Sequence, residues 1–286
     1  MNNVWRVFSK FRIHPLFWLV VALSIITANF WSLLALASLV LIHELGHAFM
    51  ASFFSWRIRS IQLLPFGGVA EMEEHGNRPM FQEWLVVLAG PVQHVWIAGL
   101  LYVLHTTSLL STSTFELWSG LNIVLLCFNL LPIWPLDGGK IVFLLLCTFQ
   151  TFVKAHERTL FVSLAVLFLY VVAVLFVEPL HMTSYVLATF LAVSLWKEWK
   201  YRRYVFIRFL LERYYGKKQS VGSLQPLRLQ EDVTVYEALT RFKRGKKHTI
   251  QSVAGGQTMG HIDENELLHV FFAENLYNTK VKDLIW

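Results

Sequence analysis

The chain has 286 residues, of which 55% are hydrophobic and only 15% are charged, and its formal net charge is +6. Soluble domains typically carry about 25% charged residues, so this composition excludes an ordinary soluble protein and indicates apolar segments that lie in a lipid bilayer. We assign the positive charge to flanks that lie on anionic lipid, and nucleic acid is not expected as a partner.

Apolar stretches of membrane-spanning length recur through the first 200 residues. Six are predicted, at about residues 13–30, 33–54, 83–104, 117–133 continuing to 150, 160–177 and 180–196. A second stretch follows the first at once, without a small-residue cleavage site, so we expect the first to remain in the mature protein. Cys127 and Cys147 lie within apolar stretches and are interpreted as small buried hydrophobic residues.

The segments that join these stretches differ in their basic residues. Segments 30–32, 105–116 and 178–179 contain no Lys or Arg, whereas basic residues recur in segments 1–12, 55–82, 148–159 and 197–286. Because cytosolic loops carry an excess of Lys and Arg, this alternation predicts that both termini lie in the cytosol.

Two histidines and a glutamate occur together in the second apolar stretch, as His43, Glu44 and His47. Side chains four residues apart share one face of a helix, so both imidazoles can bind one ion. Neutral imidazoles suit zinc, and the adjacent carboxylate suits a general base. The alternative is a polar patch that joins helices through hydrogen bonds. Because ionisable side chains are rare in hydrocarbon and usually mark functional sites, we favour a zinc site.

A catalytic zinc usually has a third protein ligand, and Asp137 is the candidate. It follows Pro132 and Pro135 and precedes Gly138 and Gly139, and these four residues interrupt an apolar stretch. They favour an unwound segment that carries the aspartate to the ion, which is tolerable at membrane depth only inside protein or a wet cavity. The same residues favour a plain cytosolic turn after the fourth stretch, and both interpretations stay open.

Together these motifs resemble the site-2 protease family of intramembrane zinc metalloproteases. The resemblance rests on HELGH at residues 43–47 and on NLLPIWPLDGGK at residues 129–140, with further matches at 63–68 and 89–91. Residues 54–57, 73–79 and 209–216 are similar to the sporulation branch of that family. That branch processes the precursor of the sigma factor sigma-K in endospore formers.

The resemblance implies a role for each matching residue. The ligands of Zn²⁺ would be His43, His47 and Asp137. The catalytic residues would be Glu44, as the general base, and Asn129, which positions the substrate or the oxyanion. The substrate-binding residues would be Pro65, Gly67, Gly68 and Pro135, with an extended substrate paired to the edge of a hairpin over residues 63–69. Six other histidines have no ligand spacing and are interpreted as structural: His94, His105, His181, His248, His261 and His269.

From about residue 220 the pattern changes to short alternating and helical segments. Their order resembles a single CBS motif, a fold that in pairs often binds adenine nucleotides, so ATP is an expected ligand of this tail. A common Ser or Thr after the glycine strand is replaced by Asp263. The alternative is therefore a domain that docks protein partners without nucleotide.

We therefore predict a polytopic α-helical membrane protein of about six transmembrane helices with a small cytosolic α+β CBS-like domain. The predicted divisions are a transmembrane metalloprotease domain at 1–200, a linker at 201–219 and a regulatory domain at 220–286. The resemblance implies regulated intramembrane proteolysis of pro-sigma-K during sporulation, in the outer forespore membrane facing the mother cell. Expected partners are that substrate, membrane inhibitor or regulatory proteins, the lipid bilayer and a second copy bound through the CBS-like domain.

Two other classes of function fit parts of the sequence. A transporter or channel would use intramembrane His, Glu and Asp to carry ions, but no inverted repeat of hydropathy is visible. A catalytically inactive relative that binds client proteins would have lost Glu44 or a histidine of the motif, and all are present. A protease is favoured over both.

Overall fold

The computed structural model describes residues 11–13, 15–56, 58–64, 67–72, 78–177, 179–216, 224–254 and 257–284. The chain divides into two compact units. The first comprises Met1–Glu74, Phe81–Ile141 and Ser163–Ala192, and the second comprises His75–Met80, Val142–Val162 and Val193–Trp286. The domain boundaries predicted from the sequence stay a prediction.

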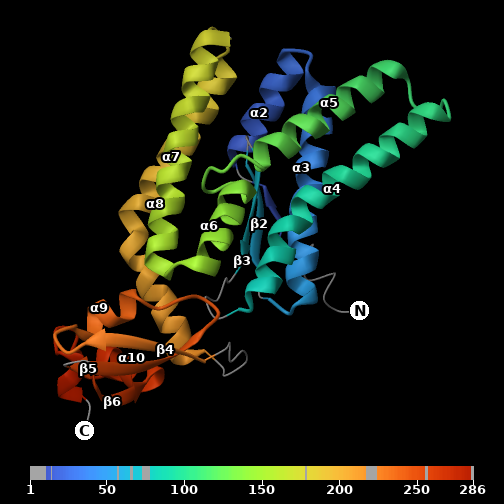
Figure 1. Ribbon diagram of the computed structural model, residues 1–286. Coiled ribbons are helices and arrows are strands. Elements are labelled where there is room, and N and C mark those ends of the chain that lie inside the picture. Colours follow the sequence, from blue (N-terminus) through green and yellow to red (C-terminus); the bar gives the residue numbers. More distant parts are fainter. Residues whose placement is uncertain are drawn as a thin grey trace. The chain divides into compact units, whose positions relative to one another are not determined.

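Most of the described residues before Tyr215 are helical. The helices are α2 (Pro15–Ile26), α3 (Phe30–Phe53), α4 (Met80–Thr106), α5 (Thr112–Asn129), α6 (Asp137–Phe149), α7 (Phe152–Val177) and α8 (Met182–Tyr215) (Figure 1). Among the described helices, α3, α4 and α7 are long and apolar enough to cross a membrane. They coincide with three of the six predicted spans, and the count of six stays a prediction.

The apolar helices expose large hydrophobic side chains. On α7, Phe161, Leu164 and Phe168 are 59%, 59% and 66% exposed, and their spacing places them on one side of the helix. Water-soluble proteins rarely expose patches of this kind, whereas lipid solvates them well. Cys147 is buried as predicted, but the prediction was wrong for Cys127, which lies on an exposed face of α5.

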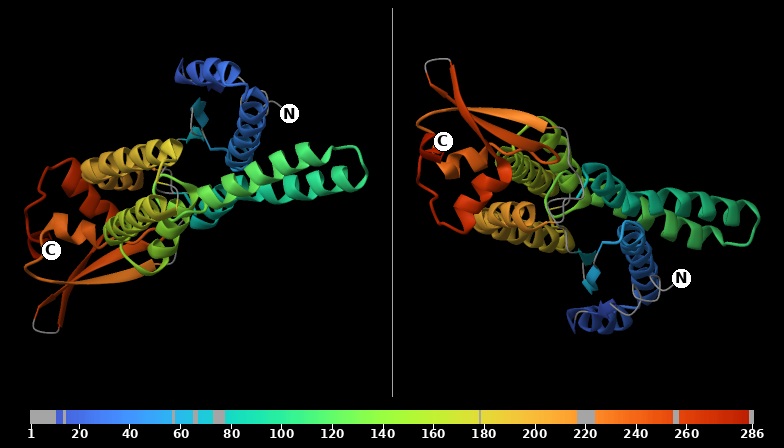
Figure 2. Two further views of the ribbon diagram at one scale, coloured as in Figure 1. Left: turned by 90° about the horizontal axis from the view of Figure 1, so that it is seen from above. Right: turned by 90° about the horizontal axis from the view of Figure 1, so that it is seen from below.

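Helices α3, α4 and α5 pack around a shared apolar cluster in the first unit. Leu39 of α3 lies at its centre with Ile97 and Leu101 of α4, and partly buried side chains of α5 pack against them. Ala35 and Ala48 of α3 are also buried, and such small residues let helix backbones approach closely. Helices α4 and α5 run antiparallel as a hairpin (Figures 1 and 2). This packing places polar residues of three helices within reach of one another.

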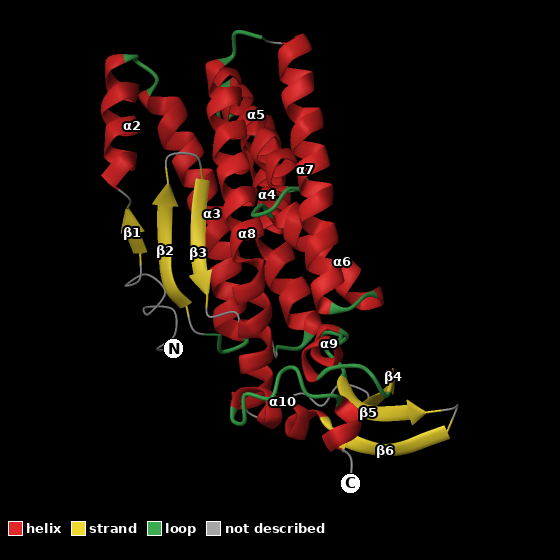
Figure 3. Cartoon of the chain, turned by 90° about the vertical axis from the view of Figure 1, so that its left-hand side faces the viewer, coloured by secondary structure: helices red, strands yellow, loops and turns green. Residues whose placement is uncertain are grey.

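A three-stranded sheet belongs to the same unit. Its strands β1 (Phe11–Ile13), β2 (Ile58–Leu64) and β3 (Gly67–Met72) lie in that order, with β2 parallel to β1 and antiparallel to β3 (Figure 3). The hairpin expected over residues 63–69 corresponds to the β2–β3 pair, in which Leu64 lies opposite Gly67 and Leu63 opposite Gly68. Because β1 is short, β3 provides the longer outer edge of the sheet among the residues described.

A small α+β fold forms the C-terminal part of the second unit. Strands β4 (Leu224–Gln230), β5 (Lys247–Ala254) and β6 (Gln257–Asp263) form a sheet in that order, with β4 parallel to β5 and β5 antiparallel to β6. Helices α9 (Val235–Thr240) and α10 (Glu264–Phe272) and the 3-10 helix η1 (Val281–Leu284) complete it (Figure 1). The order strand, helix, strand, strand, helix agrees with the short segments predicted for the tail.

Buried contacts attach this fold to the neighbouring parts of α7 and α8. The backbone N–H of Phe152 donates to the carbonyl oxygen of Phe242 at 3.0 Å, and the ring of Phe152 stacks on that of Phe209. Arg213 donates to both carboxylate oxygens of Glu264, at 2.7 and 3.0 Å. Helix α8 therefore continues to Tyr215, through most of the range predicted to be a linker, because its last turns have packing partners.

Candidate metal centre

His43 and His47 lie one turn apart on α3, and both are buried, with 4% and 5% exposure. Their Nε2 atoms are 3.1 Å apart. Residues four apart share one helix face, so the helix itself brings the two imidazoles together. Both rings therefore present a nitrogen to the same point, as expected from their four-residue spacing in the sequence.

Asp137 joins the two histidines from a distant part of the chain. Its Oδ2 atom lies 3.0 Å from Nε2 of His43 and 3.0 Å from Nε2 of His47. It is the first residue of α6, where unpaired backbone N–H groups and the helix dipole favour a carboxylate. Residues 130–136 are not helical. Of the two interpretations left open by the sequence, the structure shows the unwound segment that carries the aspartate to the histidines.

Close packing explains the glycine that follows Asp137. A Cβ atom at Gly138 would press against the backbone of Leu130 and Leu131 and lie 2.5 Å from the carbonyl carbon of Leu130. The loop before α6 is also held by the backbone N–H of Trp134, which donates to Oγ of the buried Ser163 at 2.9 Å. The loop thus folds back onto the first turn of α6, where a side chain has no room.

Helix α4 approaches the two imidazoles closely. Nδ1 of His47 lies 2.7 Å from the carbonyl oxygen of Val86, and because a carbonyl only accepts, this nitrogen carries the proton. A Cβ atom at Gly90 would lie 2.7 Å from Cε1 of His43 and closer still to the ring of His47. The rings are therefore confined between α3 and α4.

The donor set fits a zinc ion. The ligand atoms of His43, His47 and Asp137 all lie within 4.8 Å of one another, and the nearest pairs are 3.0 to 3.1 Å apart. Zinc bonds to imidazole nitrogen and carboxylate oxygen are about 2.0–2.2 Å long, so one ion can reach all three. Two neutral imidazoles and one carboxylate form a three-ligand set that leaves a position for water.

The predicted catalytic and substrate-binding residues lie on α3, α5, β3 and the loop before α6, except for one that is outside the described residues. Glu44 is 8% exposed on the turn of α3 that carries the histidines. Asn129 is the last residue of α5 and is half-buried, as is Pro135 in the loop that follows. Gly67 and Gly68 begin β3, whereas Pro65 lies outside the described residues. The catalytic and substrate-binding assignments stay predictions.

Two further residues extend the centre. His94 of α4, interpreted from the sequence as structural, has Nε2 3.1 Å from Nδ1 of His43. Its Nδ1 lies 2.8 Å from Oδ1 of Asn122 on α5. The signal in the sequence was a polar residue within each of two apolar stretches, but no spacing in the sequence connects either residue with His43.

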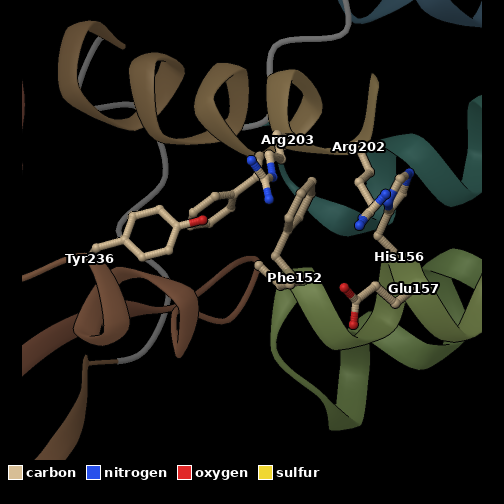
Figure 4. Close-up of a pocket in the computed structure, with 8 residues that line it drawn as sticks. Phe152, His156, Glu157, Arg202, Arg203 and Tyr236 are labelled. Atoms are coloured by element: carbon tan, nitrogen blue, oxygen red, sulfur yellow. The ribbon is translucent and has the colours of Figure 1, made fainter. Parts of the chain in front are cut away.

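The second unit contains a separate polar pocket. It is lined by side chains from the start of α7, the middle of α8 and α9: Phe152, Val153, His156, Glu157, Arg202, Arg203, Phe206 and Tyr236. Figure 4 shows Arg202 beside His156, with the Glu157 carboxylate nearby and the Tyr236 ring at the other end. His156 is buried and hydrogen-bonded to Glu198 at 2.9 Å. The pocket therefore has mixed charge and two guanidinium groups on one helix.

Comparisons with known proteins agree with this geometry. The model of peptidase family M50 matches residues 31–111 and 105–173, a range that includes His43, His47 and Asp137. The chain is 46% identical to the stage IV sporulation protein FB of Bacillus subtilis (strain 168) over 285 residues, 100% of this chain and 99% of the relative. It is 34% identical to a zinc metalloprotease of Methanocaldococcus jannaschii over 129 residues, 43% of this chain and 37% of the relative.

A solved structure is also similar. The site-2 protease from Methanocaldococcus jannaschii superimposes with a TM-score of 0.51 and 28% sequence identity, over 66% of this chain and 89% of that chain.

Proposed function

Because the chain belongs to peptidase family M50, we propose that it cleaves a membrane-associated protein within the membrane, by regulated intramembrane proteolysis during sporulation. The chain is a zinc metalloprotease by family, and three of its described helices are apolar and of spanning length. The observation that carries the proposal is the convergence of His43, His47 and Asp137, all buried, between such helices. Ionisable groups in that setting are costly and mark a functional site.

The chemistry follows from the donor set. A zinc ion held by these three side chains would polarise the scissile carbonyl and lower the pKa of a water molecule beside it. Glu44 accepts the proton of the attacking water and returns it to the leaving amine. Asn129 donates a hydrogen bond to the oxyanion that develops on the carbonyl. Burial of Glu44 beside the histidines supports the role of general base.

The substrate is bound in extended form. A helical substrate hides its peptide bonds in its own hydrogen bonds, so it must unwind before attack. The outer edge of β3 offers backbone partners to an added strand, and β3 begins with Gly67 and Gly68, which carry no side chain. We assign Pro65 and Pro135 to the same substrate path.

We propose pro-sigma-K as the substrate and the outer forespore membrane, facing the mother cell, as the location. Support comes from the 46% identity over the whole chain to a protein named for stage IV of sporulation. The apolar stretches predict six spans, and the basic segments between them predict that both termini lie in the cytosol, where the precursor and membrane inhibitor or regulatory proteins would reach the enzyme.

The C-terminal fold is proposed to be a CBS-like regulatory domain at residues 220–286 that recruits substrate, responds to ATP and pairs with a second copy. Its strand and helix order supports this. The linker proposed before it, at 201–219, is the end of helix α8 as far as Tyr215.

Arg202 and Arg203 line a pocket in the same unit and suit a phosphate. Because Phe242 contacts Phe152, deleting the tail would also disturb α7. Arg203→Ala with Tyr236→Ala is a cleaner test: it should weaken ATP binding and cleavage, whereas Arg228→Ala should not. Unchanged ATP binding in the double variant would remove the pocket from regulation.

Co-expression with a membrane-tethered sigma-factor precursor tests the main proposal. Wild type should release the processed form, and Glu44→Gln should release none while retaining zinc, because the amide cannot accept the proton of the water. Glu116→Gln, on the exposed surface of α5, is the matched control and should cleave normally. Cleavage by the Glu44 variant at the wild-type rate would exclude Glu44 as the base.

A further inference from the structure

The ring nitrogen of His43 that faces away from Asp137 enters a second set of hydrogen bonds. Nδ1 of His43 lies 3.1 Å from Nε2 of His94, and Nδ1 of His94 lies 2.8 Å from Oδ1 of Asn122. Nδ2 of Asn122 also donates to the backbone carbonyl of His94 at 2.9 Å. Exposure of the three side chains is 4%, 0% and 1%, so water does not compete for these bonds.

The positions of the protons follow from Asn122. The carbonyl of His94 only accepts, so the amide nitrogen of Asn122 must point at it, and the amide oxygen therefore faces Nδ1 of His94. An amide oxygen only accepts, so Nδ1 of His94 carries a proton. A ring with no exposure between apolar helices is uncharged, because burying a charge is costly. Nε2 of His94 is consequently an acceptor.

The proton on His43 is placed by its hydrogen bond to His94. Since Nε2 of His94 accepts, Nδ1 of His43 carries the proton and donates it, and Nε2 of His43 is left with its lone pair towards Asp137 and His47. Metal coordination needs that tautomer. The two histidines reach it by different means, because His47 donates to the backbone carbonyl of Val86, whereas His43 depends on side chains from two other helices.

We propose that His94 and Asn122 are positioning residues which fix the tautomer and ring orientation of His43 as a ligand through Nε2. This inference rests on the proposed metalloprotease function and assigns neither residue to the ion or to the substrate. Partners of this kind typically change metal affinity by about 10- to 100-fold when removed. The competing explanation is that the pair only ties α4 to α5.

Zinc affinity, measured by competition with a chelator on the full-length protein in detergent, distinguishes the two explanations. His94→Leu removes the acceptor for His43 and should weaken zinc binding by about 10- to 100-fold. His94→Gln restores an amide oxygen at that place and should recover most of the loss. Cobalt in place of zinc gives a second readout, since a turned His43 changes the visible absorption of the bound cobalt.

Variants at Asn122 distinguish a role in positioning His43 from a role that only joins α4 to α5. Asn122→Asp keeps an acceptor for Nδ1 of His94, so the positioning role predicts a much smaller loss of zinc affinity than the loss of about 10- to 100-fold that is expected when that acceptor is removed. Asn122→Leu removes the acceptor and should behave like His94→Leu. A mere tie between helices predicts that both Asn122 variants leave the cobalt spectrum unchanged, as Gln93→Leu on the partly exposed side of α4 should.

The outcomes separate this inference from the proposed function. If wild type holds zinc and His94→Leu binds it equally well with an unchanged cobalt spectrum, the positioning role is wrong and the protease is untouched. If wild type itself holds no zinc and His43→Ala changes nothing, the proposed function fails and the inference fails with it. If the leucine variants do not fold, the His94→Gln and Asn122→Asp proteins decide between the two explanations. Loss of zinc as large as that of His43→Ala in both of them would overturn the positioning role.

Discussion

Nε2 of His43 and Oδ2 of Asp137 lie 3.0 Å apart, although 94 positions separate the two residues in the chain. One belongs to the middle of a long apolar helix, and the other begins a helix after an irregular loop. The imidazole is oriented from the side of α4, and the carboxylate is placed by a loop that packs on its own helix. Both side chains must be held in place for the donor set to exist.

Removal of a proposed ligand should lower metal content. Asp137→Ala is expected to weaken zinc binding by at least about tenfold, because two imidazoles alone leave the ion short of a protein ligand. The measurement is zinc per chain after dialysis against a weak chelator. Asp232→Ala, which changes an exposed acid of the second unit, is the control and should retain its zinc. Full occupancy in Asp137→Ala would mean that the third ligand is another residue.

Gly90 should be intolerant of even a methyl group. The Cβ atom of Gly90→Ala would lie 2.7 Å from Cε1 of His43, so the rings must turn or α4 must move away. Cleavage should fall by about 100-fold, the scale on which displaced reacting groups lose rate, and zinc binding should weaken. Gly99→Ala on the same helix has nothing within 4 Å of the added atom and should be fully active. Equal activity of the two variants would contradict the close approach of α4.

The stability of the second unit should depend on pH through Glu264. Burial opposes ionisation, but hydrogen bonding to His248 and the charge of Arg213 outweigh it and hold the pKa of Glu264 below its ordinary value. A carboxyl with a lowered folded-state pKa stabilises the fold above its unfolded pKa of about 4.3, and this stability is lost as pH falls through the folded value. Glu264→Gln should remove that dependence and cost about 3 kcal/mol at neutral pH, since Arg213 stays buried without its partner.

Urea unfolding in detergent micelles, followed by a fluorescent probe at a cysteine introduced at the exposed Met259, measures this dependence. Glu274→Gln, an exposed acid, serves as the reference and should keep the wild-type profile. An identical acid transition in the Glu264 variant would assign the pH dependence to other groups.

The predicted topology is tested by labelling single cysteines. In a background without Cys127 and Cys147, cysteines at Thr107 or Ser113 should react with an impermeant reagent from outside the cytosol only. Cysteines at Lys154 or Glu274 should react from the cytosol only, because basic loops stay on that side. All four native side chains are exposed, so access to them is not limited by the fold. Reaction of both pairs from one face would overturn the map.

Local rules were enough for much of the centre. The positions of His43 and His47 follow from helix geometry alone, because a four-residue spacing produces the same neighbours in any helix. The prolines and glycines around Asp137 likewise indicated a break in an apolar stretch, since they restrict the backbone wherever they occur. The order of short strands and helices in the tail could also be read from alternation and periodicity. Sequence patterns therefore determined the chemistry of the donor set and the character of each segment.

Only the tertiary structure decided which of these segments meet. His94 and Asn122 are 51 and 79 positions beyond His43, and nothing in their spacing connects them, because contact between helices depends on how whole apolar surfaces interlock. The hydrogen bond of Arg213 to Glu264 and the parallel pairing of β1 with β2 also join segments that are distant in the chain, and no spacing in the sequence indicates either of them. A sequence of this kind specifies which side chains can bind a metal, whereas helix packing specifies which neighbours determine the ring nitrogen of each histidine that carries the proton.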